Sequence, residues 1–332
     1  MCTAIVHATK DTYFGRTLDN DFSYTEEVTV TPRNFLLPLR AAKAVESHYA
    51  VIGMAFVPDD FPLYYDAVNE KGLCMAGLNF VGNACYNHER GDGTDIAQFE
   101  LVPYILATCA TVKEATERLK CINLTDTPYR SDMPPAQLHW LLADKNGAVT
   151  VEFVRDGLKI YENPIGVLAN NPPFPEQISN LNDYMRLSPR DPLNSFSEKI
   201  SLERYSRGMG ALGLPGDLSS KSRFVRAAFA KLNSVSGSAE EESVNQFFHI
   251  LGAVEQQRGA CVVGDGGYEV TVYTSCCNAE RGVYYYTTYE NHAISAVSMY
   301  EEDLDGTRLY RYPIRDRETI VYRNGGSAPH KQ

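Results

Sequence analysis

The chain has 332 residues, 44% of them hydrophobic and 22% charged, and its formal net charge is −11. A chain of this length and composition can bury a substantial core, whereas its negative charge disfavours nucleic acid or an anionic membrane surface as the main partner. No stretch approaches the roughly 18 consecutive apolar residues of a membrane-spanning helix, and the N-terminus lacks the pattern of a signal peptide, so we expect the chain to stay in the cytoplasm.

The first predicted element is a β-hairpin at the N-terminus. Residues 3–7 and 12–18 are apolar and β-branched or aromatic, and a polar break that ends at Asp11 separates them. Two such runs joined by a short polar segment are typical of antiparallel strands. The chain therefore begins with the first residue of a central strand.

Cys2 occupies that first position. If Met1 is removed, Cys2 carries both a thiol and a free α-amine, whose ordinary pKa is about 7.7 to 8.0. One residue then supplies a nucleophile and a base. The alternative is a small buried hydrophobe, which is what most isolated cysteines are.

Arg16 and Asp19 lie at the far end of the second strand. Antiparallel pairing returns this end to Cys2. A cation beside a thiol lowers the pKa of that thiol, and a carboxylate can orient an amine. The alternative is a surface ion pair.

Short strands and then helices are predicted along the next part of the chain. The strands span residues 28–32, 49–56, 63–66 and 73–80, each bounded by turn residues, and amphipathic helices follow over residues 96–110 and 112–119.

The second half repeats this order of strands and helices. Strands are predicted over residues 138–143, 149–153, 158–162 and 166–168, a short helical stretch near 177–185, helices over 222–232 and 241–251, and strands over 267–274, 283–288, 293–299 and 308–312. This order favours an α+β fold in which two antiparallel sheets pack face to face and helices cover their outer faces.

Two asparagines and an arginine follow predicted strands or open a helix. Asn79 ends one strand and Asn170 follows another, so both are candidate donors to an oxyanion, although turn asparagines often bond only to their own backbone. Arg223 lies near a helix start, where a cation is unfavourable for the helix dipole. We therefore expect Arg223 to pair with Asp19 or with the Cys2 thiolate; the alternative is a solvated arginine on the helix.

No metal or cofactor is expected. The eight cysteines form no Cys-x-x-Cys pair and no zinc-like spacing with histidine, so we expect them to be reduced. Residues 208–213 match Gly-x-Gly-x-x-Gly, but no apolar strand precedes them and Pro215 follows, which indicates a glycine-rich loop instead of a dinucleotide site.

Met1-Cys2-Thr3, the segment 13–19 and the stretches around Asn79, Asn170 and Arg223 occur in an order that resembles the choloylglycine hydrolase family. This family contains the bile salt hydrolases and penicillin V acylases and belongs to the N-terminal nucleophile hydrolases. The resemblance runs nearly end to end. It implies a four-layer αββα sandwich, formed as one domain over residues 1–323 with a flexible tail at 324–332.

The resemblance also implies roles for particular residues. Cys2 is the nucleophile, and Arg16, Asp19, Asn79, Asn170 and Arg223 complete the catalytic set. Asn79 favours bile salt hydrolase over penicillin V acylase, which typically carries Tyr there. The substrate implied is a bile acid conjugated to glycine or taurine.

The steroid would need an apolar pocket. Aromatic candidates for it are Phe22, Tyr24, Phe56, Phe61 and Phe80, although a core position is the more common place for each of them. By resemblance, Ser206-Arg207-Gly208 indicates a preference for glycine conjugates, and a loop near residues 187–215 indicates a homotetramer, as in members from Gram-positive gut bacteria.

Three alternatives remain open at this stage. They are a penicillin V acylase, a broader N-acyl amide hydrolase, and a non-catalytic steroid-binding module. Six filled positions around a terminal thiol weigh against a pure binding role.

Overall fold

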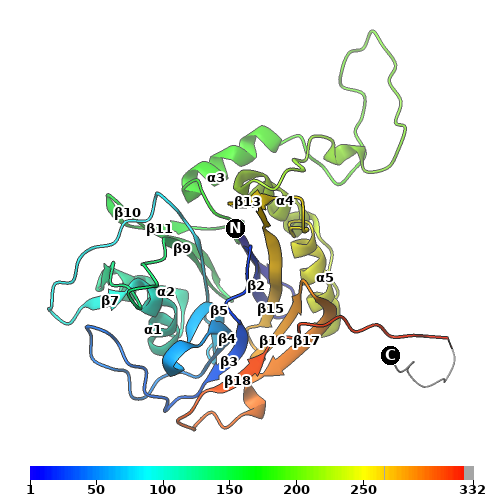
Figure 1. Cartoon of the computed structure of the whole chain (residues 1–332). Helices are drawn as coiled ribbons and strands as arrows, with labels where there is room; N and C mark the ends of the chain where they lie inside the picture. Colours follow the sequence, from blue (N-terminus) through cyan, green and yellow to red (C-terminus); the bar gives the residue numbers. More distant parts are fainter. Residues whose placement is uncertain (265, 325–332) are drawn as a thin grey trace.

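The computed structural model describes residues 1–264 and 266–324. Two antiparallel sheets form its centre and helices lie on their outer faces (Figure 1). The predicted α+β arrangement of four layers is confirmed. The tail predicted for 324–332 falls, apart from Asn324, outside the described residues.

In the first sheet, the N-terminal hairpin occupies the second and third positions. The order of this sheet is β12-β1-β2-β15-β16-β17. The strands are β12 (Val167–Leu168), β1 (Cys2–Ala8), β2 (Thr12–Asn20), β15 (Val270–Asn278), β16 (Val283–Thr288) and β17 (Asn291–Ser298). β1 and β2 are buried along almost their whole length, because a second sheet covers one face and helices the other.

The second sheet has the order β11-β10-β9-β6-β5-β4-β3-β18. Its strands are β11 (Gly157–Glu162), β10 (Gly147–Val154), β9 (Leu138–Asp144), β6 (Cys74–Asn79), β5 (Leu63–Asn69), β4 (Val51–Phe56), β3 (Glu27–Thr31) and β18 (Tyr310–Pro313). β1 and β2 lie against β6, and β12 lies against β9, so the two sheets meet at the nucleophile strand.

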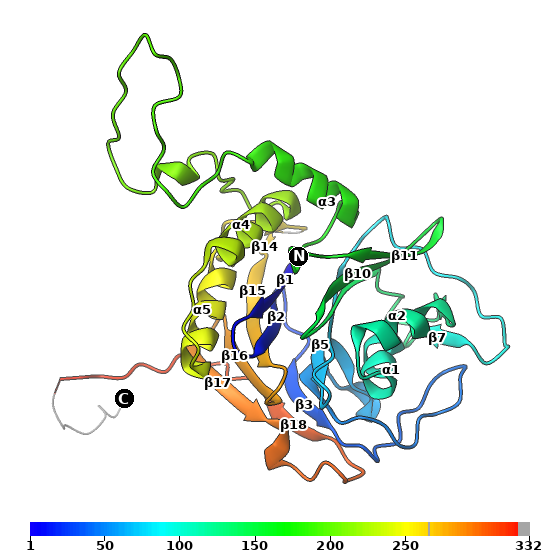
Figure 2. The ribbon, with the colours of Figure 1, turned by 180° about the vertical axis from the view of Figure 1, so that it is seen from behind.

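Helices cover both outer faces, as Figure 2 shows from behind. α1 (Leu101–Thr108) and α2 (Val112–Lys120) pack on the second sheet, while α4 (Ser220–Asn233) and α5 (Glu240–Gly252) pack on the first. One apolar core includes residues from both sheets and from α4 and α5. A second core lies between the second sheet and α1 and α2.

The helix predicted for 96–110 begins later than expected. Residues 95–97 form β7 (Asp95–Ala97), which pairs in parallel with β8 (Asn123–Thr125). The Glu100 carboxylate accepts the backbone N–H of Ala97 at 2.9 Å and fixes the turn before α1. Periodicity alone did not reveal this turn, because apolar residues continue through it.

The strand predicted for 267–274 is divided in two. Gly267–Tyr268 is the short β14, which pairs with β13 (Val262–Val263), and β15 begins at Val270. The helical stretch predicted near 177–185 is α3 (Phe174–Asn180) followed by a 3-10 turn, Leu181–Tyr184.

The chain between α3 and α4 runs outward from the two sheets (Figures 1 and 2). Apart from the short 3-10 turn Met209–Ala211, it is irregular after Tyr184. Several of its apolar side chains are exposed, including Leu193, Phe196 and Tyr205. Among the described residues, no helix combines the length and apolarity needed to cross a membrane.

Candidate active site

The hairpin register places Cys2 beside the end of β2. Cys2 pairs with Leu18, and the N–H of Asp19 donates to the carbonyl of Met1 at 2.8 Å. Cys2 is only 3% exposed, yet it lines a cavity. The predicted return of the second strand to Cys2 is therefore observed.

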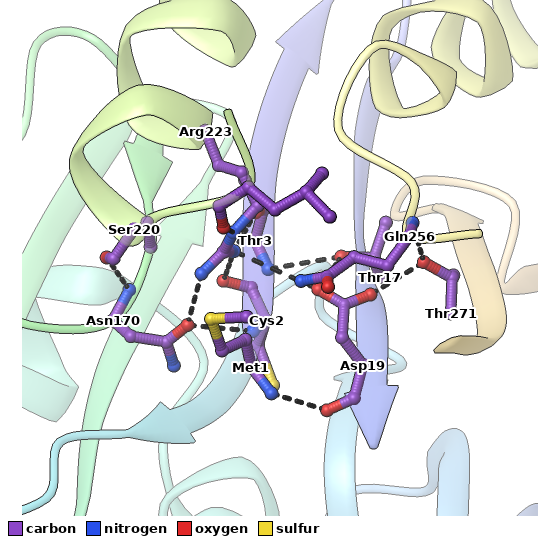
Figure 3. Close-up of polar contacts among 12 residues, drawn as sticks. Met1, Cys2, Thr3, Thr17, Asp19, Asn170, Ser220, Arg223, Gln256 and Thr271 are labelled. Atoms are coloured by element: carbon purple, nitrogen blue, oxygen red, sulfur yellow. Dashed lines mark hydrogen bonds and ion pairs between the residues drawn. The ribbon is translucent and has the colours of Figure 1, made fainter. Parts of the chain in front are cut away.

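Arg223 contacts the nucleophile residue from the first turn of α4 (Figure 3). Its guanidinium is fully buried and donates to the carbonyl of Cys2 at 2.5 Å and to the Thr3 hydroxyl at 2.6 Å. Nη2 donates to Asn170 Oδ1 at 2.7 Å. The arginine that was expected to pair with Asp19 or the thiolate binds mainly the backbone of Cys2 and the amide of Asn170.

The Asn170 side chain joins three parts of the site. Oδ1 accepts the backbone N–H of Cys2 at 2.8 Å, and Nδ2 donates to the carbonyl of Asn79 at 2.9 Å. The backbone N–H of Asn170 donates to the Ser220 hydroxyl at 2.8 Å. The amide thus faces the nitrogen that becomes the α-amine if Met1 is removed.

Asp19 is buried with its carboxylate among donors. Oδ1 accepts the Thr271 hydroxyl at 2.7 Å, Oδ2 accepts the Thr17 hydroxyl at 3.2 Å, and Arg223 Nη1 lies 3.8 Å from Oδ2. Burial raises the pKa of Asp19, whereas Arg223 and the N-terminal ammonium act to lower it. The net shift is upward, because complete burial outweighs these partners.

Arg16 extends from β2 toward the second sheet. Its guanidinium donates to the carbonyls of Tyr65 at 3.3 Å and of Gly77. Burial acts to lower the pKa of Arg16, but the Cys2 thiol, Tyr273 and Asp66 act to raise it, and the net pKa lies above its ordinary value. Arg16 therefore keeps its positive charge near the sulfur.

The Met1 ammonium occupies a polar position on the other side of Cys2. It donates to the carbonyl of Asp19 at 2.5 Å and forms an ion pair with the Glu269 carboxylate. Met1 lines a separate depression in the surface together with Leu218 and Cys261. In this form of the chain, the nitrogen of Cys2 is part of a peptide bond and is not a free amine.

The cavity beside Cys2 has a volume of about 450 Å³. Catalytic candidates Arg16, Asp19 and Asn79 lie in its wall together with many apolar residues. The apolar and aromatic part of the wall comprises Leu18, Tyr24, Phe56, Leu63, Tyr64, Tyr65, Phe99, Tyr129, Met133, Pro134, Pro135, Ala136 and Leu138. Such a wall suits a large apolar acyl group whose carbonyl reaches the sulfur.

Two of the five predicted pocket aromatics line this cavity. Tyr24 and Phe56 do so with ring centroids 6.1 Å apart. Phe61 packs behind the wall against Phe99 and Tyr129. A position close to the nucleophile strands in the sequence therefore pointed to the cavity for Tyr24 and Phe56 but not for Phe61.

The other predicted pocket residues lie elsewhere. Phe22 lines a different cavity, and its ring packs edge-on against Tyr24 with centroids 4.5 Å apart. Phe80 is fully buried and stacks on His139 with ring centroids 4.3 Å apart. Arg207 is exposed on the segment that runs outward between α3 and α4.

Sequence reasoning missed several residues that hold the site together. Thr271 and Glu269 come from the start of β15 or just before it, and Ser220 from the start of α4. Single hydroxyl and carboxylate residues such as these form no recognisable sequence motif. Only the pairing of β15 with β2, which no local pattern indicates, brings Thr271 beside Asp19.

This arrangement has the components of an acyl-transfer site. A sulfur lies at the edge of an apolar cavity, a buried cation lies near it, and an amide with both donor and acceptor atoms faces the adjacent nitrogen. Among the described residues, no cluster of three or more His, Cys, Asp or Glu side chains suited to a metal ion occurs. All eight cysteines are free thiols.

Comparison with known proteins gives a consistent result. Residues 2–312 match the model of the linear amide C–N hydrolases, choloylglycine hydrolase family. The chain is 53% identical over 315 residues to a bile salt hydrolase/transferase of Lactiplantibacillus plantarum, covering 95% of this chain and 97% of that protein.

Solved structures show the same architecture. A variant of conjugated bile acid hydrolase from Clostridium perfringens superposes with a TM-score of 0.89 at 36% identity, covering 97% of this chain and 100% of that one. Penicillin V acylase from Agrobacterium tumefaciens, at 20% identity and a TM-score of 0.74, shares the fold over 93% of this chain and 90% of its own. The resemblance found in the sequence is thus confirmed, and the chain belongs to the choloylglycine hydrolase family of linear amide C–N hydrolases.

Proposed function

We propose that this protein is a bile salt hydrolase that cleaves the amide bond of bile acids conjugated to glycine or taurine. The observation that carries the proposal is the position of Cys2, at the edge of an apolar cavity and within one hydrogen-bonded group with Arg223 and Asn170. The relatives from Lactiplantibacillus plantarum and Clostridium perfringens, both bile salt hydrolase/transferases by name, support the substrate class.

The reaction requires removal of Met1. The free α-amine of Cys2 accepts the thiol proton, and the thiolate attacks the amide carbonyl of the conjugate. Asn79 and Asn170 stabilise the oxyanion of the tetrahedral intermediate; loss of one such donor typically costs about 2.7 to 4 kcal/mol. The protonated amine then gives its proton to the leaving nitrogen, which departs as glycine or taurine.

A thioester between Cys2 and the bile acid remains. The α-amine accepts a proton from water as the water attacks the carbonyl, the sulfur departs, and the free bile acid is released. An amine that replaces water gives a new amide, so the same intermediate supports acyl transfer. Asp19, whose carboxylate accepts hydrogen bonds from Thr17 and Thr271, is expected to orient this amine.

Hydrolysis of glycocholate by purified protein tests the proposal. Intact mass must show loss of one methionine, and the mature protein must release glycine. Cys2→Ala and a form that retains Met1 are expected to be inactive, whereas Cys121→Ala, which changes an exposed thiol, keeps full activity. Hydrolysis at the wild-type rate by Cys2→Ala would disprove the mechanism.

Penicillin V acylase is the alternative enzyme. The shared fold with the Agrobacterium protein leaves this substrate open, but Asn79 at the cavity favours the bile salt hydrolases within the family. Assays with glycocholate and penicillin V side by side decide between them. Faster release of phenoxyacetate than of cholate would support the acylase. Binding of bile acid without cleavage of either amide would support a non-catalytic binding protein.

We also propose a homotetramer assembled through the outward segment between α3 and α4. Leu193, Phe196 and Tyr205 on this segment are 80 to 90% exposed, and such exposed apolar side chains are typical of association surfaces. Light scattering on purified protein tests the assembly. A monomer at micromolar concentration would contradict it.

The same segment contains Ser206-Arg207-Gly208, and we propose a preference for glycine over taurine conjugates. Because Arg207 is exposed on a segment that leaves the body of its own chain, its effect on the substrate would be exerted within the assembly. Comparison of kcat/KM for glycocholate and taurocholate tests the preference. Equal values, or a higher value for taurocholate, would exclude it.

A further inference from the structure

A histidine that belongs to no catalytic motif contacts both of the segments that carry the two asparagines. His139 lies in β9 and is fully buried. Its ring stacks on Phe80, the residue after Asn79, at 4.3 Å between centroids and 6° between planes. Its Nε2 lies 2.8 Å from the carbonyl of Ala169, the residue before Asn170.

The second ring nitrogen faces a buried carboxylate. His139 Nδ1 lies 3.2 Å from Oε1 of Glu152, on the adjacent strand β10. A carbonyl can only accept, so Nε2 donates in its contact with Ala169, while Nδ1 faces the carboxylate of Glu152. The two residues therefore form a dyad in which contacts at both ring nitrogens fix the ring orientation.

The dyad holds both ends of the segment that bears Asn170. Glu152 Oε1 also accepts the backbone N–H of Phe174 at 2.9 Å, while His139 binds the carbonyl of Ala169. Residues 169–173 belong to no helix or strand, so their buried backbone groups need partners from side chains.

Gln177 supplies the remaining bonds to this segment. It is fully buried in α3, and its Nε2 donates to the carbonyls of Asn170 at 2.5 Å and Pro172 at 2.7 Å. Together, His139, Glu152 and Gln177 fix a short irregular segment from three different elements. None of the three lines the cavity beside Cys2.

We propose that His139 and Glu152, with Gln177, are positioning residues for the oxyanion-binding asparagines. Resting on the proposed acyl-transfer function, the dyad aligns Asn170 through Ala169 and Asn79 through Phe80, so that both amides approach one carbonyl oxygen. The dyad takes no part in proton transfer to substrate. Because it acts only by aligning the two asparagines, its removal lowers the rate of the chemical step and leaves substrate binding unchanged.

Two complementary variants separate the contacts of the ring. His139→Phe keeps an aromatic ring against Phe80 but removes the hydrogen bond to Ala169, and His139→Gln keeps a donor for Ala169 but removes the ring. A misplacement of about 1 Å can cost about 100-fold in rate. For His139→Phe we expect kcat for glycocholate to fall about 100-fold with KM within about twofold, and for His139→Gln we expect partial recovery, to within about tenfold of wild type.

A matched control excludes general destabilisation. Leu119 lies in α2, which packs on the opposite face of β9 and β10, and Leu119→Ala weakens the same strands without contacting the 169–174 segment. We expect Leu119→Ala to lower the unfolding midpoint and leave kcat unchanged. Gln177→Met removes both donors at nearly constant volume, and it provides the second test if His139→Phe does not fold.

The outcomes are distinguishable from failure of the proposed function. If wild-type protein does not cleave glycocholate, the function is wrong and the same variants are compared on the substrate that is cleaved. If wild type cleaves it, the inference is overturned when His139→Phe and Gln177→Met retain kcat within twofold, when they raise KM instead, or when His139→Gln recovers nothing relative to His139→Phe.

Discussion

Arg223 Nη2 donates to Asn170 Oδ1 at 2.7 Å, and both side chains also contact the backbone of Cys2. Arg223 binds the carbonyl of Cys2, and Asn170 binds its N–H. The backbone of the nucleophile is thus held at both polar groups by side chains that also hold each other. These hydrogen bonds hold the backbone of Cys2 in addition to its strand pairing with Leu18.

Asn170→Ala is expected to remove most activity. The change deletes the acceptor for Cys2 and Arg223 and the donor to Asn79, and loss of one oxyanion donor costs about 10²- to 10³-fold in kcat. Asn171→Ala is the matched control, because the neighbouring amide is exposed and, among the residues that the structure describes, bonds to Asn83 and to the carbonyl of Val81 and not to Cys2 or Arg223. Equal kcat values for the two variants in a glycocholate assay would contradict the role of Asn170.

Asp66 provides a prediction about pH and stability. Its buried carboxylate accepts hydroxyl groups from Tyr273 at 2.6 Å, Tyr284 at 2.7 Å and Ser275 at 2.9 Å. Burial raises its pKa above the ordinary 3.8, although Arg16 and these hydrogen bonds act in the opposite direction. The folded chain therefore binds this proton more tightly than the unfolded chain does.

A raised folded-state pKa makes the contribution of Asp66 to stability largest below pH 3.8, and this contribution is lost as the pH rises through the raised value. Asp66→Asn cannot ionise. The unfolding free energy of Asp66→Asn minus that of wild type is expected to become more positive from pH 4 upward, as measured by urea unfolding at several pH values. Asp156→Asn, at an exposed turn, is the control. A constant difference across the range would show that the carboxyl group does not titrate differently in the two states.

The sequence was informative where neighbours in the chain are also neighbours in the fold. The hairpin of β1 and β2 was predictable because its strands are adjacent and its register follows from a short turn. Asn170 and Arg223 were candidates because they follow a predicted strand and lie near a predicted helix start, and the resemblance to the family assigned their roles. No local pattern reports that β15 pairs with β2 about 250 residues away, and so Thr271 was not recognised.

The features that the sequence did not reveal have a similar physical origin. The orientation of Phe80 and Phe22 depends on which face of a strand or loop meets which layer, and aromatic residues suit a core and a cavity equally well. The start of α1 depends on a carboxylate, Glu100, that bonds back to Ala97. These contacts are set by tertiary packing, which the periodicity of a single segment does not contain.

The cysteines provide a test of burial across the molecule. Burial raises the pKa of Cys74, Cys276 and Cys277 well above the ordinary value, and it also shields their sulfur atoms. Brief treatment with iodoacetamide at pH 8 is expected to label the exposed Cys85 and Cys121 and to spare these three, as peptide mass spectrometry would show. Labelling of all five at similar rates in folded protein would contradict the described packing.

Tyr24 offers a test of how the cavity binds the acyl group. Tyr24 is 42% exposed, and its ring lines the cavity beside Phe56. Truncation to Ala removes apolar contact worth roughly 1 to 2 kcal/mol, and because this contact is made equally with substrate and transition state, KM for glycocholate is expected to rise about tenfold with kcat nearly unchanged. Tyr300→Ala is the control, since Tyr300 is 50% exposed and lies outside the cavity wall. A fall in kcat at constant KM would instead place Tyr24 in the chemical step, and an unchanged KM would mean that the acyl group does not occupy this cavity.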